Sequence, residues 1–245
     1  MIARVTAETV RSWEVRDEAS LRILSQFAAY GDGQGFLRFY QDDGGCYLSL
    51  MDDVATLSAV GETSEMRLML QMDSTVRHIR TDRDTAALIA AERGLPFDTN
   101  AVMQASLLDA SGGRAQFLEL KAIYPVLVRG FGDAIPPFDS WYADAHHRFR
   151  RGLCRAVGLC DGDAVVAVAM TVAECEKEAL IGAVTTLPEA RGKGYASDCV
   201  NTLTARLQRE GKRVWLSPKN DPAKRLYERL GFVACGEWGS LSIYE

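Results

Sequence analysis

The sequence lacks any long apolar run. No stretch approaches the roughly 18 consecutive apolar residues that a membrane-spanning helix needs. The first residues, Met1–Glu8, also lack the long apolar segment of a signal peptide. We therefore expect a cytoplasmic protein without a membrane partner.

The chain has no excess of positive charge either. It carries 28 Lys and Arg against 33 Asp and Glu, a formal net charge of −5, with a pI near 5.4. Broad nucleic-acid binding usually needs a basic face, so we expect no nucleic-acid partner. Any basic site must be local.

No two cysteines have the C-x-x-C spacing typical of metal and redox sites. Most of the six lie in apolar strand or helix patterns, and we interpret them as reduced core residues and expect no metal. They are Cys46, Cys154, Cys160, Cys175, Cys199 and Cys235.

What is present is a chain of 245 residues, 47% of them apolar, enough to bury the core of one large domain or two small ones. Its most informative segment is the glycine-rich, doubly basic turn Arg191-Gly192-Lys193-Gly194. The apolar run 179–186 before it predicts a buried strand, and the apolar spacing over 195–210 predicts a helix. Glycines at such a junction let a ligand approach the main chain, and free amides at the helix start favour an anion. The pattern indicates a phosphate site, although it also occurs in solvated turns.

The hexapeptide Arg191–Ala196 resembles the Arg/Gln-x-x-Gly-x-Gly/Ala signature of the GNAT superfamily of N-acetyltransferases, whose loop holds the pyrophosphate of acetyl-CoA. The order of elements over residues 150–235 is also similar: a strand, the loop, a helix, a strand at 213–217, a helix at 222–230 and the pair Gly231-Phe232. The resemblance implies a mixed α/β (α+β) fold, a GNAT-like central mixed sheet flanked by helices, with acetyl-CoA as co-substrate. It implies cofactor contacts from the loop residues Arg191, Gly192, Lys193, Gly194, Tyr195 and Ala196.

The segment Asn220–Phe232 is similar to a second motif of that family. Pro222 suits a first helical position, Asp221 is a plausible N-cap and Gly231 a plausible stop. Tyr227 falls on the inward stripe, where it is either a core aromatic residue or, by the resemblance, the general acid that reaches the thioester sulfur. The resemblance also implies that Asn220 contacts the pantetheine or phosphate arm.

The strand before the loop has a further role in that family. Pantetheine hydrogen-bonds to the main chain at the strand end that corresponds to Val184, Thr185 and Thr186. An exposed sheet edge offers such bonds without any special side chain. The two threonines can equally be ordinary strand residues.

The sequence does not single out a general base. Glu174, Glu176 and Glu178 precede the predicted active-site strand, but such a charged run is usually a solvated turn, and water can also accept the proton. His146 and His147 have suitable basicity and point to different helix faces. Four aromatic residues of the predicted helical segment 118–150 line a substrate pocket or pack in the core: Phe131, Phe138, Trp141 and Tyr142.

The first half echoes the second. Strands are predicted over 36–41, 46–51, 54–60 and 76–81, then a helix over 84–93. An offset of 137 residues sets Gly94 against Gly231 and Asp84 against Asp221. Because only 15 positions separate Gly61 from Val76, against 27 between Thr186 and Arg213, the first copy lacks room for the loop and a full helix. We therefore expect two tandem GNAT-like halves, a degenerate one at 1–117 and a catalytic one at 118–245, with one cofactor site.

The function expected from the resemblance is an N-acetyltransferase that moves an acetyl group from acetyl-CoA to a primary amine of a small molecule or peptide. The acidic net charge weakly favours cationic acceptors. Two alternatives stay open: a noncatalytic acyl-CoA-binding module and a transferase that uses a longer acyl donor.

Overall fold

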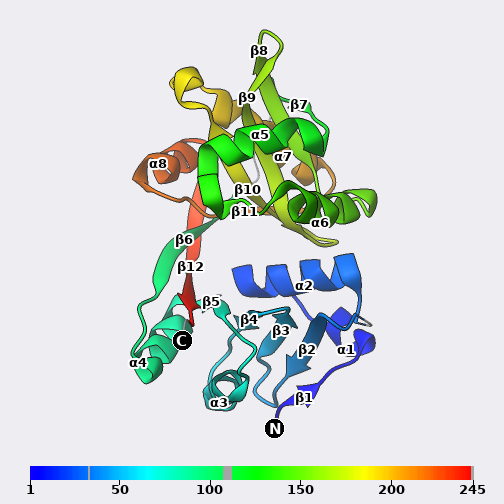
Figure 1. The fold of residues 1–245 in the computed structure, drawn as a ribbon, viewed down its shortest axis with the longest axis vertical. Coiled ribbons are helices and arrows are strands. Elements are labelled where there is room, and N and C mark those ends of the chain that lie inside the picture. Colours follow the sequence, from blue (N-terminus) through cyan, green and yellow to red (C-terminus); the bar gives the residue numbers. More distant parts are fainter. Residues whose placement is uncertain (33, 107–111, 244–245) are drawn as a thin grey trace. The chain divides into compact units, whose positions relative to one another are not determined.

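The structure is a computed structural model that describes residues 1–32, 34–106 and 112–243. Its contacts divide the chain into two compact units (Figure 1). One comprises Met1–Val102 with Cys235–Glu245, and the other comprises Met103–Ala234. No helix in the described residues combines the length and apolar character needed to cross a membrane.

The second unit contains a mixed sheet with the strand order β6-β11-β10-β9-β8-β7. The strands β8, β9 and β10 form an antiparallel meander, and β10 runs parallel to β11. Helix α7 (Tyr195–Arg209) makes the crossover between these two parallel strands. The strand bounds are Asp98–Ala105 (β6), Gln116–Phe117 (β7), Ala156–Asp161 (β8), Ala164–Glu174 (β9), Glu178–Thr186 (β10) and Arg213–Leu216 (β11).

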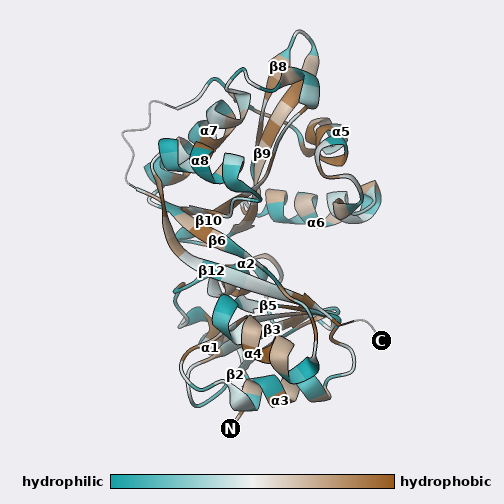
Figure 2. Ribbon diagram, turned by 90° about the vertical axis from the view of Figure 1, so that its left-hand side faces the viewer, coloured by the Kyte–Doolittle hydropathy of each residue, from teal (hydrophilic) through white to brown (hydrophobic). Residues whose placement is uncertain are grey.

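Helices cover both faces of this sheet, as the continuous apolar character of β9 predicts. Figure 2 shows α7 and α8 (Asp221–Arg229) on one side of β9, and α5 (Leu120–Phe131) and α6 (Phe138–Arg150) on the other. Alternate residues of β9 enter the two cores: Ala167 packs with the α7 side, and Val166 and Val168 with the α5 side. A 3-10 turn, Gly132–Ala134, separates α5 from α6.

The first unit repeats the pattern. Its strands β2, β3 and β4 form an antiparallel meander, and β4 pairs in parallel with β5. The strand bounds are Ala3–Arg4 (β1), Leu37–Gln41 (β2), Tyr47–Met51 (β3), Val54–Ser58 (β4) and His78–Asp82 (β5). The helices are Ala7–Arg11 (α1), Glu18–Tyr30 (α2), Ser64–Met72 (α3) and Arg83–Arg93 (α4).

Strands from each half of the sequence pair with strands of the other half. The end of β6 pairs with β11 through Met103 and Gln104, whereas β12 (Phe232–Ser242) pairs with β5 through Trp238 and the residues after it. The compact units therefore begin and end elsewhere than the predicted domains 1–117 and 118–245. That division into repeats stays a prediction.

One predicted helix cap is wrong. The N-cap of α8 is Asn220, whose side chain accepts a hydrogen bond from the Ala223 amide at 3.0 Å, so Asp221 is the first helical residue. The N-cap of α6 is Pro137. Among the cysteines, Cys160 and Cys235 are exposed, whereas the other four are buried, and all six are free.

A buried carboxylate holds the paired ends of β10 and β11. Glu178 is 2% exposed and accepts hydrogen bonds from Arg213 Nε at 2.6 Å and Trp215 Nε1 at 2.7 Å. The interaction fixes the two strands at the end where their parallel pairing starts. Glu176, in the preceding turn, is exposed.

We expect Glu178→Ala to lower the free energy of unfolding by about 1–3 kcal/mol, because the Trp215 indole N–H would be left buried without an acceptor. Glu176→Ala is the control, with an expected change within about 0.5 kcal/mol. Urea unfolding followed by tryptophan fluorescence measures both. Equal midpoints for the two variants would contradict a structural role of Glu178.

Candidate functional site

The parallel strands β10 and β11 separate at their carboxyl ends. Their pairing runs from Glu178↔Arg213 to Ile181↔Leu216, and β10 then continues to Thr186 while β11 ends. A β-bulge lies just beyond this point, where Ala183 and Val184 oppose one residue of β9. Ala183 has a φ of 50°, an unusual conformation for a residue with a side chain. The bulge bends β10, and the edge of this strand that faces away from β9 is left unpaired after Ile181.

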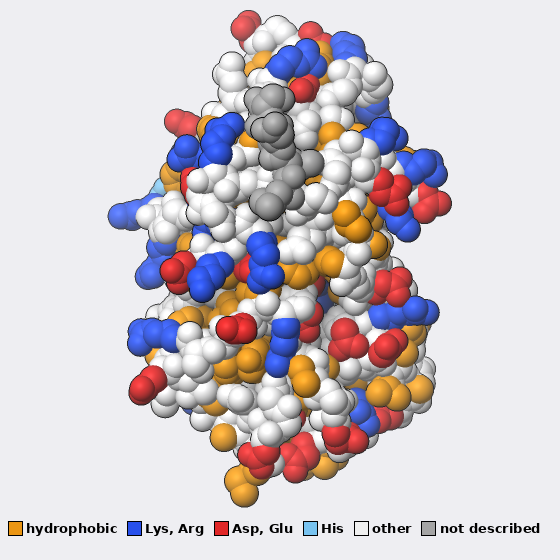
Figure 3. Space-filling model, turned by 180° about the vertical axis from the view of Figure 1, so that it is seen from behind, with side chains coloured by type: hydrophobic (Ala, Val, Ile, Leu, Met, Phe, Trp, Pro, Cys, Tyr) orange, Lys and Arg blue, Asp and Glu red, His pale blue; other side chains and the backbone are white. Residues whose placement is uncertain are grey.

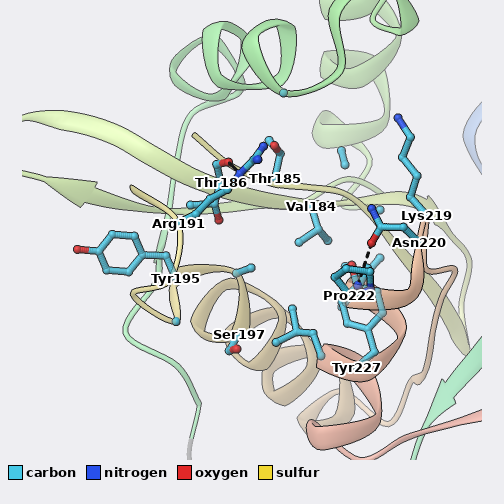
Figure 4. Close-up of a pocket in the computed structure, with 18 of the residues that line it drawn as sticks. Val184, Thr185, Thr186, Arg191, Tyr195, Ser197, Lys219, Asn220, Pro222 and Tyr227 are labelled. Carbon is cyan, nitrogen blue, oxygen red and sulfur yellow. Dashed lines mark hydrogen bonds between the residues drawn. The ribbon is translucent and has the colours of Figure 1, made fainter. Parts of the chain in front are cut away.

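A cavity of about 730 Å³ lies at this separation (Figure 4). It brings together residues from α5, β10, the loop after β10, the start of α7, and α8. The predicted site residues that line it are Val184, Thr185, Thr186, Arg191, Gly192, Gly194, Tyr195, Ala196, Asn220 and Tyr227. Lys193 is the one predicted site residue that does not line the cavity. The fold therefore places nearly all of the predicted site residues around one cavity.

The glycine loop presents backbone amides. Gly192 and Gly194 both have φ near 80°, the left-handed region that glycine adopts without strain. Gly194 is the N-cap of α7, with no side-chain cap, and the first helical bond runs from the Asp198 amide to the Gly194 carbonyl. Within the described chain, the amides from Gly192 to Ser197 have no hydrogen-bond acceptor. These donors and the N-terminus of a 15-residue helix could hold an anion, and we call them the candidate anion site.

The two basic residues of the loop are placed differently. The Arg191 side chain lies on the cavity wall and donates from Nε to the Thr186 carbonyl at 3.2 Å. The Lys193 ammonium is 2.8 Å from a carboxylate oxygen of Asp161, in an exposed ion pair. Lys193 can therefore contribute its backbone amide to the candidate anion site, while Arg191 contributes a charge.

Tyr227 extends from α8 toward the cavity, near Val184 in Figure 4. The residue is only 5% exposed and packs against Phe232 with ring centroids 6.1 Å apart. Burial raises the pKa of its phenol from the ordinary 10.0 to about 12. The phenol therefore keeps its proton throughout the physiological pH range. Both interpretations of Tyr227, core aromatic and proton donor, agree with this placement.

Asn220 faces the cavity with one side-chain atom already engaged. Its Oδ1 caps α8, as the dashed line in Figure 4 marks. The side-chain NH₂ group is therefore what Asn220 has available for a ligand.

The sequence did not indicate how α5 approaches the cavity. Gly130 lies where an added Cβ would overlap the Thr185 side chain, so only glycine lets α5 pack this close to β10. Phe131 lines the cavity, whereas Phe138, Trp141 and Tyr142 pack around Tyr124 or one another. A glycine inside an otherwise helical pattern, such as Gly130, is a sequence feature that can indicate close packing.

The carboxylates considered as bases do not line the cavity. Glu174 and Glu178 are buried, and Glu174 accepts from Arg155 at 2.7 Å. Glu178 begins β10, and Glu174 ends β9 opposite Ala179, so both lie at the end of this strand pair that is away from the bulge. His146 stacks on Tyr142 with centroids 5.1 Å apart, and neither it nor His147 lines the cavity.

In the first unit, the two parallel strands that correspond to β10 and β11 stay paired where β10 and β11 separate. The pairing of β4 with β5 extends to Thr56↔Arg80, and the 137-residue offset sets Arg80 against Ser217, where β10 and β11 have already parted. Arg80 donates to both carboxylate oxygens of Glu18, at 2.8 and 2.9 Å. Burial opposes ionisation of Glu18, but Arg22 and Arg80 outweigh it and hold its pKa below the ordinary value. Helix α3 has nine residues, against 15 in α7, and Ala90 stands where the second unit has Tyr227.

Comparison with known proteins agrees with this geometry. The FR47-like protein family model matches residues 156–238. No curated protein sequence matches the chain.

Several solved structures have a similar fold along nearly the whole chain. An acetyltransferase of the GCN5-related type from Sphaerobacter thermophilus is 15% identical with a TM-score of 0.65, over 98% of this chain and 94% of that one. One from Kribbella flavida is 18% identical with a TM-score of 0.61, over 91% and 96%. A tandem GNAT protein of the clavulanic acid biosynthesis pathway is 15% identical with a TM-score of 0.61, over 99% and 98%. The separated parallel strands, the amide-lined loop and these matches together show that the chain has the fold of the GNAT superfamily, in a tandem form.

Proposed function

We propose that this protein is an N-acetyltransferase that transfers the acetyl group of acetyl-CoA to a primary amine. The observation that carries the proposal is the cavity between β10 and β11, which has the candidate anion site at one end and a protonated phenol in its wall. The GCN5-related N-acetyltransferase fold of the compared structures supports the same class of reaction.

The residues present fit the co-substrate. The amides from Gly192 to Ser197 and the Arg191 guanidinium would hold the diphosphate. The unpaired edge of β10 at Val184–Thr186 would hydrogen-bond the pantetheine arm as an added strand. The NH₂ group of Asn220 would donate to the same arm. When bound, acetyl-CoA supplies a thioester carbonyl that the acceptor amine attacks, so that a C–N bond forms and the C–S bond breaks.

Two protons must move in this reaction. Tyr227 holds a phenolic proton on the cavity wall and would donate it to the departing thiolate. The amine must lose a proton, and no carboxylate or imidazole is among the described residues that line the cavity. Water would therefore accept that proton, and the acceptor reacts in its neutral form.

Arg191→Ala should weaken acetyl-CoA binding about 10- to 100-fold, because a charge-assisted hydrogen bond to phosphate contributes about 1.5–3 kcal/mol. Lys193→Ala is the matched control, since its ammonium already pairs with Asp161, and its affinity should change by less than about threefold. Calorimetric titration measures both. A larger loss for Lys193→Ala than for Arg191→Ala would place the diphosphate elsewhere.

Tyr227→Phe should lower kcat by about 100-fold or more while the affinity for acetyl-CoA stays unchanged, because only the proton donor is removed. Thiol release over a diverse amine panel gives the rate, and calorimetry gives the affinity. Full activity in the variant would assign Tyr227 to the core alone.

Binding of acetyl-CoA without turnover of any amine by the wild-type protein would instead indicate a noncatalytic module. Faster turnover of longer thioesters would indicate a longer acyl donor.

The raised pKa of Tyr227 predicts the pH dependence. A phenol with a folded pKa of about 12 stays protonated below that pH, so the acid is not lost between pH 7 and 10. Over the same range the neutral fraction of an amine acceptor grows. We expect kcat/KM to rise with pH up to the pKa of the acceptor amine and then stay level to pH 10. A descending limb centred below pH 9 that disappears in Tyr227→Phe would contradict the raised pKa.

A further inference from the structure

The charged side chains on the cavity wall all have one sign. Among the described residues that line it, these are Arg191, Lys219 and Arg229. The chain as a whole carries a net charge of −5, and basic and acidic side chains are interspersed on the face drawn in Figure 3. The cavity is therefore locally positive in an acidic protein.

Arg191 and Lys219 occupy separate places in this cavity. Arg191 lies beside Thr186, next to the amide-lined loop. Lys219 belongs to the segment after β11, next to the cap residue Asn220. Figure 4 shows the two on opposite sides of Val184, with the Lys219 side chain directed away from Tyr227 and toward the helix above β10. Lys219 is thus remote from the group of amides that would hold the diphosphate.

An aromatic ring holds the Lys219 ammonium on the cavity wall. Its Nζ lies 5.5 Å from the centroid of the Phe131 ring, at the end of α5. This distance is typical of a cation–π contact. No carboxylate within the described chain pairs with Lys219. Lys219 is exposed, and its cation, on a wall without acidic residues, is available to an anionic group of a ligand.

We propose, on the basis of the N-acetyltransferase function above, that the acceptor is an amine that also carries a carboxylate, and that Lys219 binds this carboxylate. An ammonium–carboxylate contact would orient the acceptor while its amine reaches the thioester carbonyl. The class of acceptor is then a small amino acid or similar compound. This differs from the cationic acceptors that the net charge weakly favours, because the local charge of the site acts at contact distance.

The test compares Lys219→Met with wild type on matched acceptors: α-amino acids of increasing size and their α-carboxamides, which lack the carboxylate. Each compound is compared with itself across the variants, so differences in amine basicity between compounds cancel. Lys219→Arg keeps the charge, and Lys224→Met, an exposed lysine of α8 outside the cavity lining, is the control. We expect Lys219→Met to raise KM about tenfold or more for the carboxylates and less than about twofold for the amides and acetyl-CoA. Lys219→Arg should retain most of the wild-type KM, and Lys224→Met should match wild type.

Two results would overturn the proposal. An equal increase for acids and amides would show that Lys219 does not bind a carboxylate, and an increase confined to acetyl-CoA would assign it to a phosphate of the co-substrate. If no amine is turned over, calorimetric titration of the same amino acids into the CoA-loaded protein decides the question. Binding that weakens in Lys219→Met would keep the carboxylate site and reject only the transferase function, and no binding to wild type would reject the site.

Discussion

The parting of two parallel strands is the constraint on which the site depends. In a continuous parallel sheet the backbone groups of β10 beyond Ile181 would be paired with β11. The bulge at Ala183 and Val184 bends β10, so these groups face a cavity. The same separation makes room for Tyr227 of α8 and for the loop at the start of α7. Backbone strain at Ala183 costs on the order of 1–3 kcal/mol, and the buried Glu178 interaction at the paired end opposes further opening.

The two halves show what this separation requires. Both have a meander followed by a parallel pair, but in the first half the pairing persists to Thr56↔Arg80. There Arg80 and Glu18 form a mostly buried ion pair, with side chains 21% and 2% exposed. An ion pair of this kind gains little net stability, yet breaking it would leave an uncompensated buried charge. The short α3 brings no amide-lined loop to the strand ends. The first half therefore keeps the topology without the features that bind a co-substrate in the proposed mechanism.

The sequence predicts those features that local rules determine. Strand β10, the glycine loop, α7 and α8 follow from apolar periodicity and turn residues, and the bounds of the strand and of both helices lie within one residue of the prediction. The bulge is not visible, because Ala183 is not a residue type that marks positive φ. The pairing of β6 with β11 and of β12 with β5 depends on residues far apart in the chain. The burial of Glu178 was not predicted either, because a charged run normally indicates a solvated turn. The residues that bond Glu178, Arg213 and Trp215, lie 35 and 37 residues away in the chain.

The net charge of the chain and the local charge of the cavity differ in sign. The net charge determines the electrostatic field at a distance from the protein surface. At physiological salt this field is screened over about 8–10 Å. Recognition at the cavity depends on groups at contact distance, and the described lining contains cations without carboxylates. Two acidic residues near the glycine loop are paired with other cations: Asp161 with Lys193, and Glu189 with Arg129. Neither of these carboxylates lines the cavity. An acidic protein can in this way maintain a positive site, and composition alone gives the wrong sign for it.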